Sequence, residues 1–138
     1  MNLLPEELQR LLDHCQSLAK LLLDEQDEFY PFGTYLNNEN VITQSMFNDG
    51  DDYPLSTGLI QIIRYDFDQQ LAAQLIQASA ITYAARITGK TGSREVIVVR
   101  LNGSQMASAL LCYLPYQLAK GVVEYGTSWI ESEQNNPA

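Results

Sequence analysis

The sequence predicts an α+β fold: a two-layer sandwich in which two helices cover one face of an antiparallel sheet of about five or six strands. Two separate apolar series at helical spacing indicate the helices, and the second half of the chain alternates between strand-like runs and turns. Because short turns join consecutive strands, the sheet should be antiparallel, with the element order α-β-β-α-β-β-β. The 138 residues fit a single domain, 1–138.

The first helix is expected from Pro5 to Gln26. Proline suits the first helical turn, and Glu6 and Glu7 complement the positive end of the helix dipole. The apolar stripe that defines the buried face alternates spacings of four and three residues: Leu4, Leu8, Leu11, Cys15, Leu18 and Leu22.

A β-hairpin is expected next. Residues 32–36 alternate as a strand, residues 37–40 are rich in turn formers, and residues 41–44 resume the strand. Residues 48–54 form a loop by composition.

The second helix should begin near Ser56 or Thr57, either of which can cap it. It should end at about residues 77–79. Its apolar residues recur at a four-residue spacing: Leu59, Ile63, Phe67, Leu71 and Leu75.

The remaining strands are expected at residues 81–88, 95–101 and 107–114, with an edge strand within 122–130. Pro115 should end the third of these, and a polar tail from about residue 131 should be frayed. The face that no helix covers would carry Thr82, Arg86, either Arg94 or Glu95, and Arg100, depending on the register of the strands.

The charge balance indicates which kinds of partner the chain is not expected to bind. The net charge is −9, and only eight Lys and Arg residues are present, so neither nucleic acid nor an anionic membrane surface is an expected partner. No apolar run is long enough to span a bilayer, and the N-terminus has no signal-peptide pattern. A cytoplasmic protein is therefore expected.

Catalytic, cofactor and metal motifs are not recognisable in the sequence. His14 is the single histidine, and Cys15 and Cys112 are predicted to be small buried residues rather than a redox pair. The acidic loop 48–52 does not match a calcium-binding loop, and residues 89–92 do not match a phosphate-binding loop.

Pairs of carboxylates are the remaining enzymatic option. Glu25 with Glu28, or Asp66 with Asp68, could carry out acid–base chemistry if a cleft raised the pKa of one member. The simpler interpretation is that these residues belong to solvated helix surfaces.

Tyrosines suggest a binding surface. The chain has eight tyrosines against four phenylalanines, and tyrosine combines apolar area with a hydroxyl group, as interfaces favour. The predicted binding residues are Tyr30, Tyr35, Tyr113 and Tyr116. In the structural alternative, Phe29 and Phe32 simply anchor the helix–strand junction in the core.

Two short motifs carry a resemblance. The leucine-patterned helix is followed by Glu-Phe-Tyr-Pro-Phe-Gly at residues 28–33, and a later strand closes on Leu-Pro-Tyr at residues 114–116. In this the chain resembles small uncharacterised bacterial α+β proteins that have no established function. Its size and acidity also resemble those of immunity proteins of bacterial toxin systems.

The expected function is therefore that of a small non-enzymatic protein-interaction module, immunity-like or accessory. Its partner would be another protein, for which a basic one is suited, or a second copy of the chain in a homodimer. The alternative is a small-ligand-binding module with an aromatic pocket between sheet and helices, and a carboxylate-dependent enzyme is a third alternative.

Overall fold

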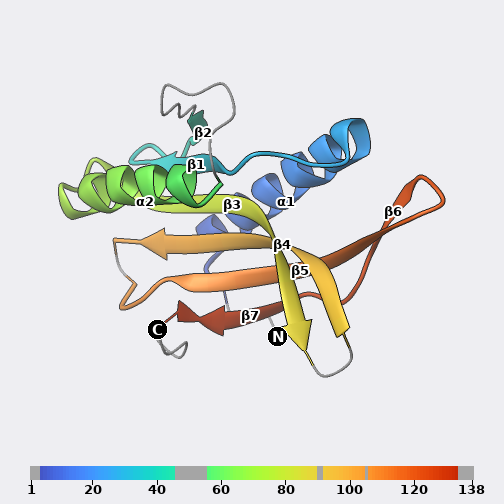
Figure 1. Cartoon of the computed structure of the whole chain (residues 1–138). Helices are drawn as coiled ribbons and strands as arrows, with labels where there is room; N and C mark the ends of the chain where they lie inside the picture. The colour runs from blue at the N-terminus through green and yellow to red at the C-terminus, as the bar shows by residue number, and fades with distance from the viewer. Residues whose placement is uncertain (1–3, 46–55, 90–91, 105, 134–138) are drawn as a thin grey trace.

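The computed structural model describes residues 4–45, 56–89, 92–104 and 106–133. Within them the chain forms two helices and seven strands in an α-β-β-α-β-β-β-β-β order (Figure 1). The elements are α1 (Glu6–Gln26), β1 (Phe32–Asn37), β2 (Ile42–Ser45), α2 (Ser56–Ala72), β3 (Ile76–Gly89), β4 (Gly92–Gly103), β5 (Leu110–Ala119), β6 (Val122–Tyr125) and β7 (Trp129–Ser132).

All seven strands belong to one antiparallel sheet with the order β2-β1-β3-β4-β5-β6. Strand β7 pairs with residues 110–113 of β5, and β6 pairs with residues 116–119 of the same strand. The predicted α+β class, the antiparallel sheet and the order of the first seven elements are confirmed. The seven predicted elements are followed by two short strands, because the edge strand expected within residues 122–130 is divided into β6 and β7.

Helix α1 packs on one face of the sheet. Its stripe buries Leu8, Leu11, Cys15, Ala19 and Leu23 in one cluster with side chains from β1, β3, β4 and β5. The first four residues of the predicted stripe are buried as expected, but Leu18 and Leu22 are only partly buried, because their neighbours Ala19 and Leu23 face the core in the last turns of the helix. Its sheet contacts come from alternate positions of each strand, among them Leu36, Ala78, Ala80, Ile97, Val99, Leu101, Cys112 and Leu114.

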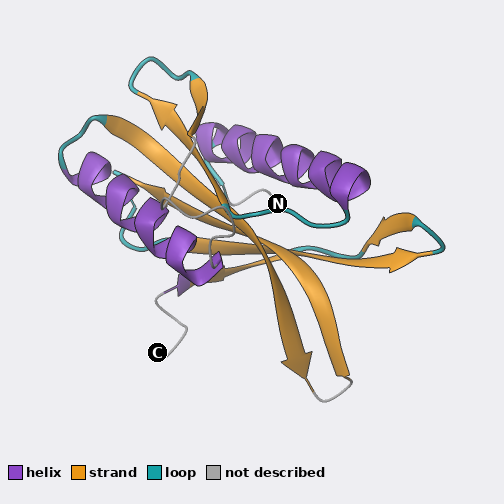
Figure 2. Ribbon diagram, turned by 45° about the horizontal axis from the view of Figure 1, so that its top comes forward, coloured by secondary structure: helices purple, strands orange, loops and turns teal. Residues whose placement is uncertain are grey.

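Helix α2 packs on the opposite face. Its buried Ile63, Phe67 and Leu71 cluster with Ile76 and Ile81, and Tyr35 packs against them. The expectation of a two-layer sandwich with both helices on one face is wrong, because the helices lie on opposite faces of the sheet and make three layers, as Figures 1 and 2 show. The physical reason lies in β3, where consecutive residues are buried in different clusters: Ala80 lies under α1 and Ile81 under α2.

The second helix is shorter than predicted. It ends at Ala72, and β3 starts at Ile76 after a turn in which Gln74 has a φ of 60°. Leu75, which would continue the helical series, is 64% exposed. The apolar residues after it follow the two-residue period of a strand instead.

The C-terminal strands also differ from the prediction. Strand β5 continues through Pro115, which lies between the section paired with β7 and the section paired with β6. Since proline lacks an N–H group, this change of partner is a position where it is tolerated. Gly126 follows β6 and donates to the carbonyl of Pro115 at 2.9 Å, which separates β6 from β7. Residues 131–133 are not frayed, because β7 runs to Ser132.

Candidate functional site

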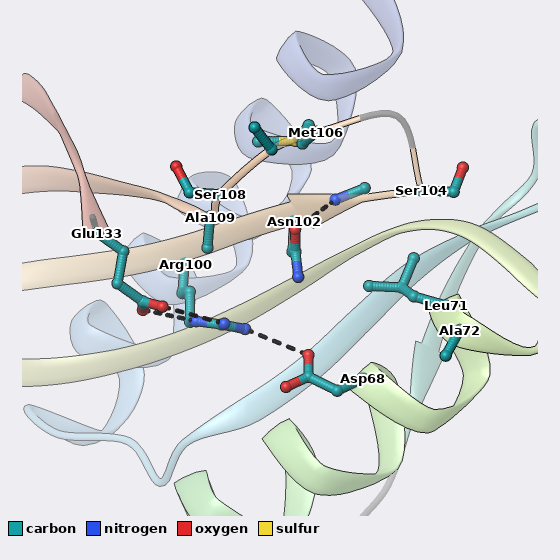
Figure 3. Close-up of a pocket in the computed structure, with 12 residues that line it drawn as sticks. Asp68, Leu71, Ala72, Arg100, Asn102, Ser104, Met106, Ser108, Ala109 and Glu133 are labelled. Carbon is teal, nitrogen blue, oxygen red and sulfur yellow. Dashed lines mark hydrogen bonds and ion pairs between the residues drawn. The ribbon is translucent and has the colours of Figure 1, made fainter.

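A cleft of about 510 Å³ opens between the C-terminal half of α2 and the connection from β4 to β5 (Figure 3). Apolar and polar side chains share its wall, and charged groups form its floor. The residues that line it are Asp68, Leu71, Ala72, Arg100, Asn102, Gly103, Ser104, Met106, Ala107, Ser108, Ala109 and Glu133.

Arg100 is the most deeply buried of the charged residues that line the cleft. It lies on β4 within the apolar run 96–101, and only 6% of it is exposed. Its Nε donates to Glu133 Oε2 at 2.8 Å, and its Nη2 donates to Glu133 Oε1 at 3.2 Å. This two-point pairing fixes the plane and direction of the guanidinium group.

Two residues of α2 complete the charged group. Arg64 Nη2 donates to Glu133 Oε1 at 3.2 Å, and Arg64 Nε lies 3.8 Å from Asp68 Oδ2. Asp68 Oδ1 lies 3.7 Å from Arg100 Nη1. The four charges link α2, β4 and the segment after β7, and we call them the Arg100 network.

The electrostatics of the Arg100 network keep Glu133 in its charged form. The hydrogen bonds from Arg100 lower the pKa of Glu133, so that carboxylate stays ionised at neutral pH. A carboxylate in this state has no proton to donate as a general acid, and its lowered pKa makes it a weaker general base than an ordinary glutamate. What the cleft offers instead is a set of fixed hydrogen-bonding groups beside apolar surface.

A second surface lies on the same face of the sheet, on the part that neither of the two described helices covers. The strand registers place Tyr83, Val98, Tyr113 and Trp129 opposite one another in a single row across β3, β4, β5 and β7. The rings of Tyr113 and Trp129 stack at a centroid distance of 5.0 Å.

This row continues toward the end of the β3–β4 hairpin. Ala85 and Ile87 are partly buried beside it and pack against a cluster that contains the buried Val96 and Val98. The guanidinium carbon of Arg94 lies 5.2 Å from the centroid of the Trp129 ring, within the range of a cation–π contact. The surface formed by Tyr83, Ala85, Ile87, Arg94, Tyr113 and Trp129 is called the aromatic face below.

The cleft and the aromatic face are neighbours. Tyr83 belongs to the aromatic face, yet its pKa is raised first by burial and then by the negative charge of Glu133. In the sheet, the pair Ile81–Arg100 lies two residues from the pair Tyr83–Val98, so Arg100 is the neighbour of this row on the same face.

The four tyrosines predicted to bind a partner do not form one surface. Tyr113 lies in the aromatic face, whereas Tyr35 packs edge-on against Phe67 of α2 at a centroid distance of 6.0 Å. Tyr116 packs on the α1 side of the sheet, and Tyr30 is 54% exposed in the connection between α1 and β1. Their roles in binding remain predictions.

The two motifs behind the family resemblance meet in space. Glu28 and Phe29 of the first motif and Tyr116 of the second line a cavity of about 720 Å³ at the C-terminal end of α1. The ion pair between Arg86 and Glu95, 2.6 Å apart, borders the same cavity on the hairpin. The pair is largely open to solvent, so it contributes little to stability.

Other candidates from the sequence are placed as follows. Cys15 and Cys112 are buried free thiols in the α1 core, as predicted, and His14 is exposed. Asp68 lines the cleft, but Asp66 instead accepts a hydrogen bond from Gln70 at 2.7 Å. Glu25 and Glu28 are exposed, and the acidic loop 48–52 lies outside the described residues.

Sequence reasoning missed Arg100, Glu133 and Trp129. The available signal was Arg100 itself, a charged residue at the end of a run of buried valine and isoleucine, where an ionic partner is required. Glu133 could not be matched to it, because the predicted tail was expected to be frayed.

Comparison with protein-family models, curated proteins and solved structures finds no match to this chain. In the described segments, neither helix is both long and apolar enough to cross a membrane. The same segments contain no cluster of three or more His, Cys, Asp or Glu residues suited to hold a metal ion.

Proposed function

We propose that the protein is a small non-enzymatic protein-binding module that contacts its partner through the aromatic face. The observation that supports this is the row of Tyr83, Tyr113 and Trp129 on the part of the sheet that the described helices leave uncovered. Tyr, Trp and Arg are the residue types that contribute most to protein–protein affinity, and Arg94 lies over this row.

The stacked pair suits this role for a physical reason. Tyr113 and Trp129 hold each other in place, so little side-chain entropy would be lost on binding. Each ring presents apolar area together with a polar group that can donate a hydrogen bond.

The charge of the chain supports a partner of positive net charge. A net charge of −9 attracts a basic protein over long range and accelerates its association. An immunity-like role, in which the protein binds and blocks a basic toxin, is the concrete form of the proposal, and an accessory subunit is the other.

The test is affinity capture of the tagged protein from its native cell lysate, followed by measurement of the affinity for the recovered partner. We expect Trp129→Ala to weaken binding by tenfold or more, or about 1.4 kcal/mol. Tyr65→Ala is the matched control, since Tyr65 is 70% exposed on α2 and lies outside the aromatic face.

Circular dichroism and a urea midpoint for each variant separate lost binding from lost folding. Equal affinity for a partner in the Trp129→Ala variant and the parent chain would contradict the proposal. Recovery of the chain alone would exclude a different partner, and sedimentation of the two variants would then show whether the aromatic face joins two copies in a homodimer.

The Arg100 cleft favours a second function, the binding of a small ligand. Its 510 Å³ lies within the usual range of ligand sites, roughly 300–1,000 Å³. A carboxylate-dependent enzyme has less support, because the lowered pKa of Glu133 leaves it no proton to donate as a general acid and makes it a weak general base.

A further inference from the structure

Two polar atoms of the Arg100 network face each other without a hydrogen bond. Arg100 Nη1 and Asp68 Oδ1 are both buried, and within the described part of the chain neither has a hydrogen-bond partner. Their separation of 3.7 Å is an ion-pair distance, but it is too long for a direct hydrogen bond. Buried polar atoms in this state are costly, and a group that bonds to both would remove the cost.

The chemistry of such a group is set by the two atoms. Arg100 Nη1 can only donate, and Asp68 Oδ1, as part of a carboxylate, can only accept. The bound group must therefore carry an acceptor next to a donor. Arg64, Arg100, Asp68 and Glu133 sum to no net charge, so a charged ligand would leave a charge in the cleft without compensation.

We propose that the Arg100 cleft binds a small uncharged molecule through a carboxamide group. The amide oxygen accepts a hydrogen bond from Arg100 Nη1, and the amide N–H donates to Asp68 Oδ1. This function is independent of partner binding at the aromatic face.

The dimensions agree with this arrangement. The oxygen and nitrogen of one carboxamide are about 2.3 Å apart, as follows from standard bond lengths. Two hydrogen bonds of about 2.9 Å can therefore connect them to atoms that lie 3.7 Å apart.

The surroundings suit the rest of such a molecule. Leu71, Ala72, Met106 and Ala109 provide apolar wall for a ring or alkyl group. Arg100 itself stays in place on binding, because Glu133 already holds its Nε and Nη2. The side chain of Asp68, which is 44% exposed, shifts to admit the amide, because both unbonded atoms are closed to solvent.

Three probes of nearly identical shape test the proposal: benzamide, benzoate and benzamidine. They present, in turn, an acceptor beside a donor, two acceptors with a negative charge, and donors alone with a positive charge. Titration of each into the ¹⁵N-labelled protein is followed by NMR at the backbone amides of Asn102, Gly103 and Ala109. We expect saturable shifts with benzamide and an affinity for it at least about fivefold above that of either charged probe.

Substitution of Asp68 tests the acceptor. Asp68→Ala should weaken benzamide binding by about tenfold, the usual effect of a lost hydrogen bond to a charged group. Asp66→Ala is the matched control, since it removes the same charge from the same helix but from a residue outside the cleft. Asp68 is preferred to Arg100 for substitution because its side chain is 44% exposed, so its loss is compatible with folding.

Three results would overturn the proposal. Benzoate or benzamidine binding as tightly as benzamide would show that charge alone governs the cleft. Shifts that never saturate with benzamide would show that the cleft holds solvent only. Equal benzamide affinity in Asp68→Ala and Asp66→Ala would remove Asp68 from the site. None of these results bears on the aromatic face.

Discussion

The two thiols of the α1 core show how a single buried residue responds to its surroundings. Burial raises the pKa of Cys112 to about 12, and proximity to Cys15 adds to the effect. Burial also raises the pKa of Cys15, against the opposing effect of hydrogen bonds with Thr34 and Thr82. Both residues therefore remain uncharged thiols in the folded protein at neutral pH.

These shifts predict a loss of stability in alkaline solution. Above the unfolded pKa of 9.0, the unfolded chain releases a proton that folded Cys112 retains, so the free energy of unfolding falls as pH rises toward about 12. The largest possible slope is about 1.4 kcal/mol per pH unit for each thiol. Urea unfolding at several pH values between about 8 and 10.5 measures this slope.

Cys112→Ala is the informative variant for this prediction. It should lower stability at every pH by creating a cavity, but it should give a shallower pH slope than the parent chain. The remaining slope comes from Cys15 and from tyrosines whose pKa burial also raises, including Tyr83 and Tyr116. Identical slopes in the two proteins would contradict the assignment to Cys112.

The environment of a single residue could be predicted from the sequence where it depends on near neighbours in the chain. The position of Cys15 on the leucine stripe was enough to predict its burial. Arg100 was expected on an open face, because its partner Glu133 is 33 residues away and could not be inferred from spacing. Tyr113 and Tyr116 were grouped although they are three residues apart on one strand, which places them on opposite faces.

The C-terminal end of α1 carries an unfavourable residue. Asp27 adopts the left-handed conformation with a φ of 63°, and its N–H donates to the carbonyl of Leu23 at 2.9 Å. Glycine is favoured at such a position, and a negative charge beside the helix C-terminus is unfavourable.

We therefore predict that Asp27→Gly stabilises the protein by about 1 kcal/mol. Asp27→Asn separates the two causes, since it removes the charge but keeps a side chain, and about 0.5 kcal/mol is expected for it. Thermal unfolding followed by circular dichroism measures both variants. A gain no larger for glycine than for asparagine would show that charge, not backbone conformation, is limiting.

At the scale of elements, the first helix was predictable to within one residue because its stripe is long and regular. The start of β3 was not, since the four-residue series from Leu59 reaches Leu75 and hides the change to a two-residue period at Ile76. The division of the last strand at Gly126 depends on its hydrogen bond to Pro115, which sequence alone does not reveal. The side of the sheet that each helix covers follows only from tertiary packing.

For the whole molecule, β3 is the shared element. Its 14 residues place Ala78 and Ala80 under α1, Ile81 under α2 and Tyr83 in the aromatic face. The Arg100 network adds a second connection, since it joins α2 to β4 and to the end of the C-terminal strands. Local unfolding of β3 would therefore remove the packing surface of both helices at once.

This arrangement predicts a single cooperative unfolding transition. The chain has one tryptophan, Trp129 on β7, so its fluorescence reports the C-terminal strands, whereas circular dichroism at about 222 nm reports the two helices. We expect the two signals to give the same urea midpoint and the same slope. Glu133→Gln, which weakens the connection between α2 and the residues after β7, should lower both midpoints together. If fluorescence changed at lower urea than circular dichroism, β5 and β7 would form a separate, less stable unit, and the Arg100 network would not join the two halves of the fold.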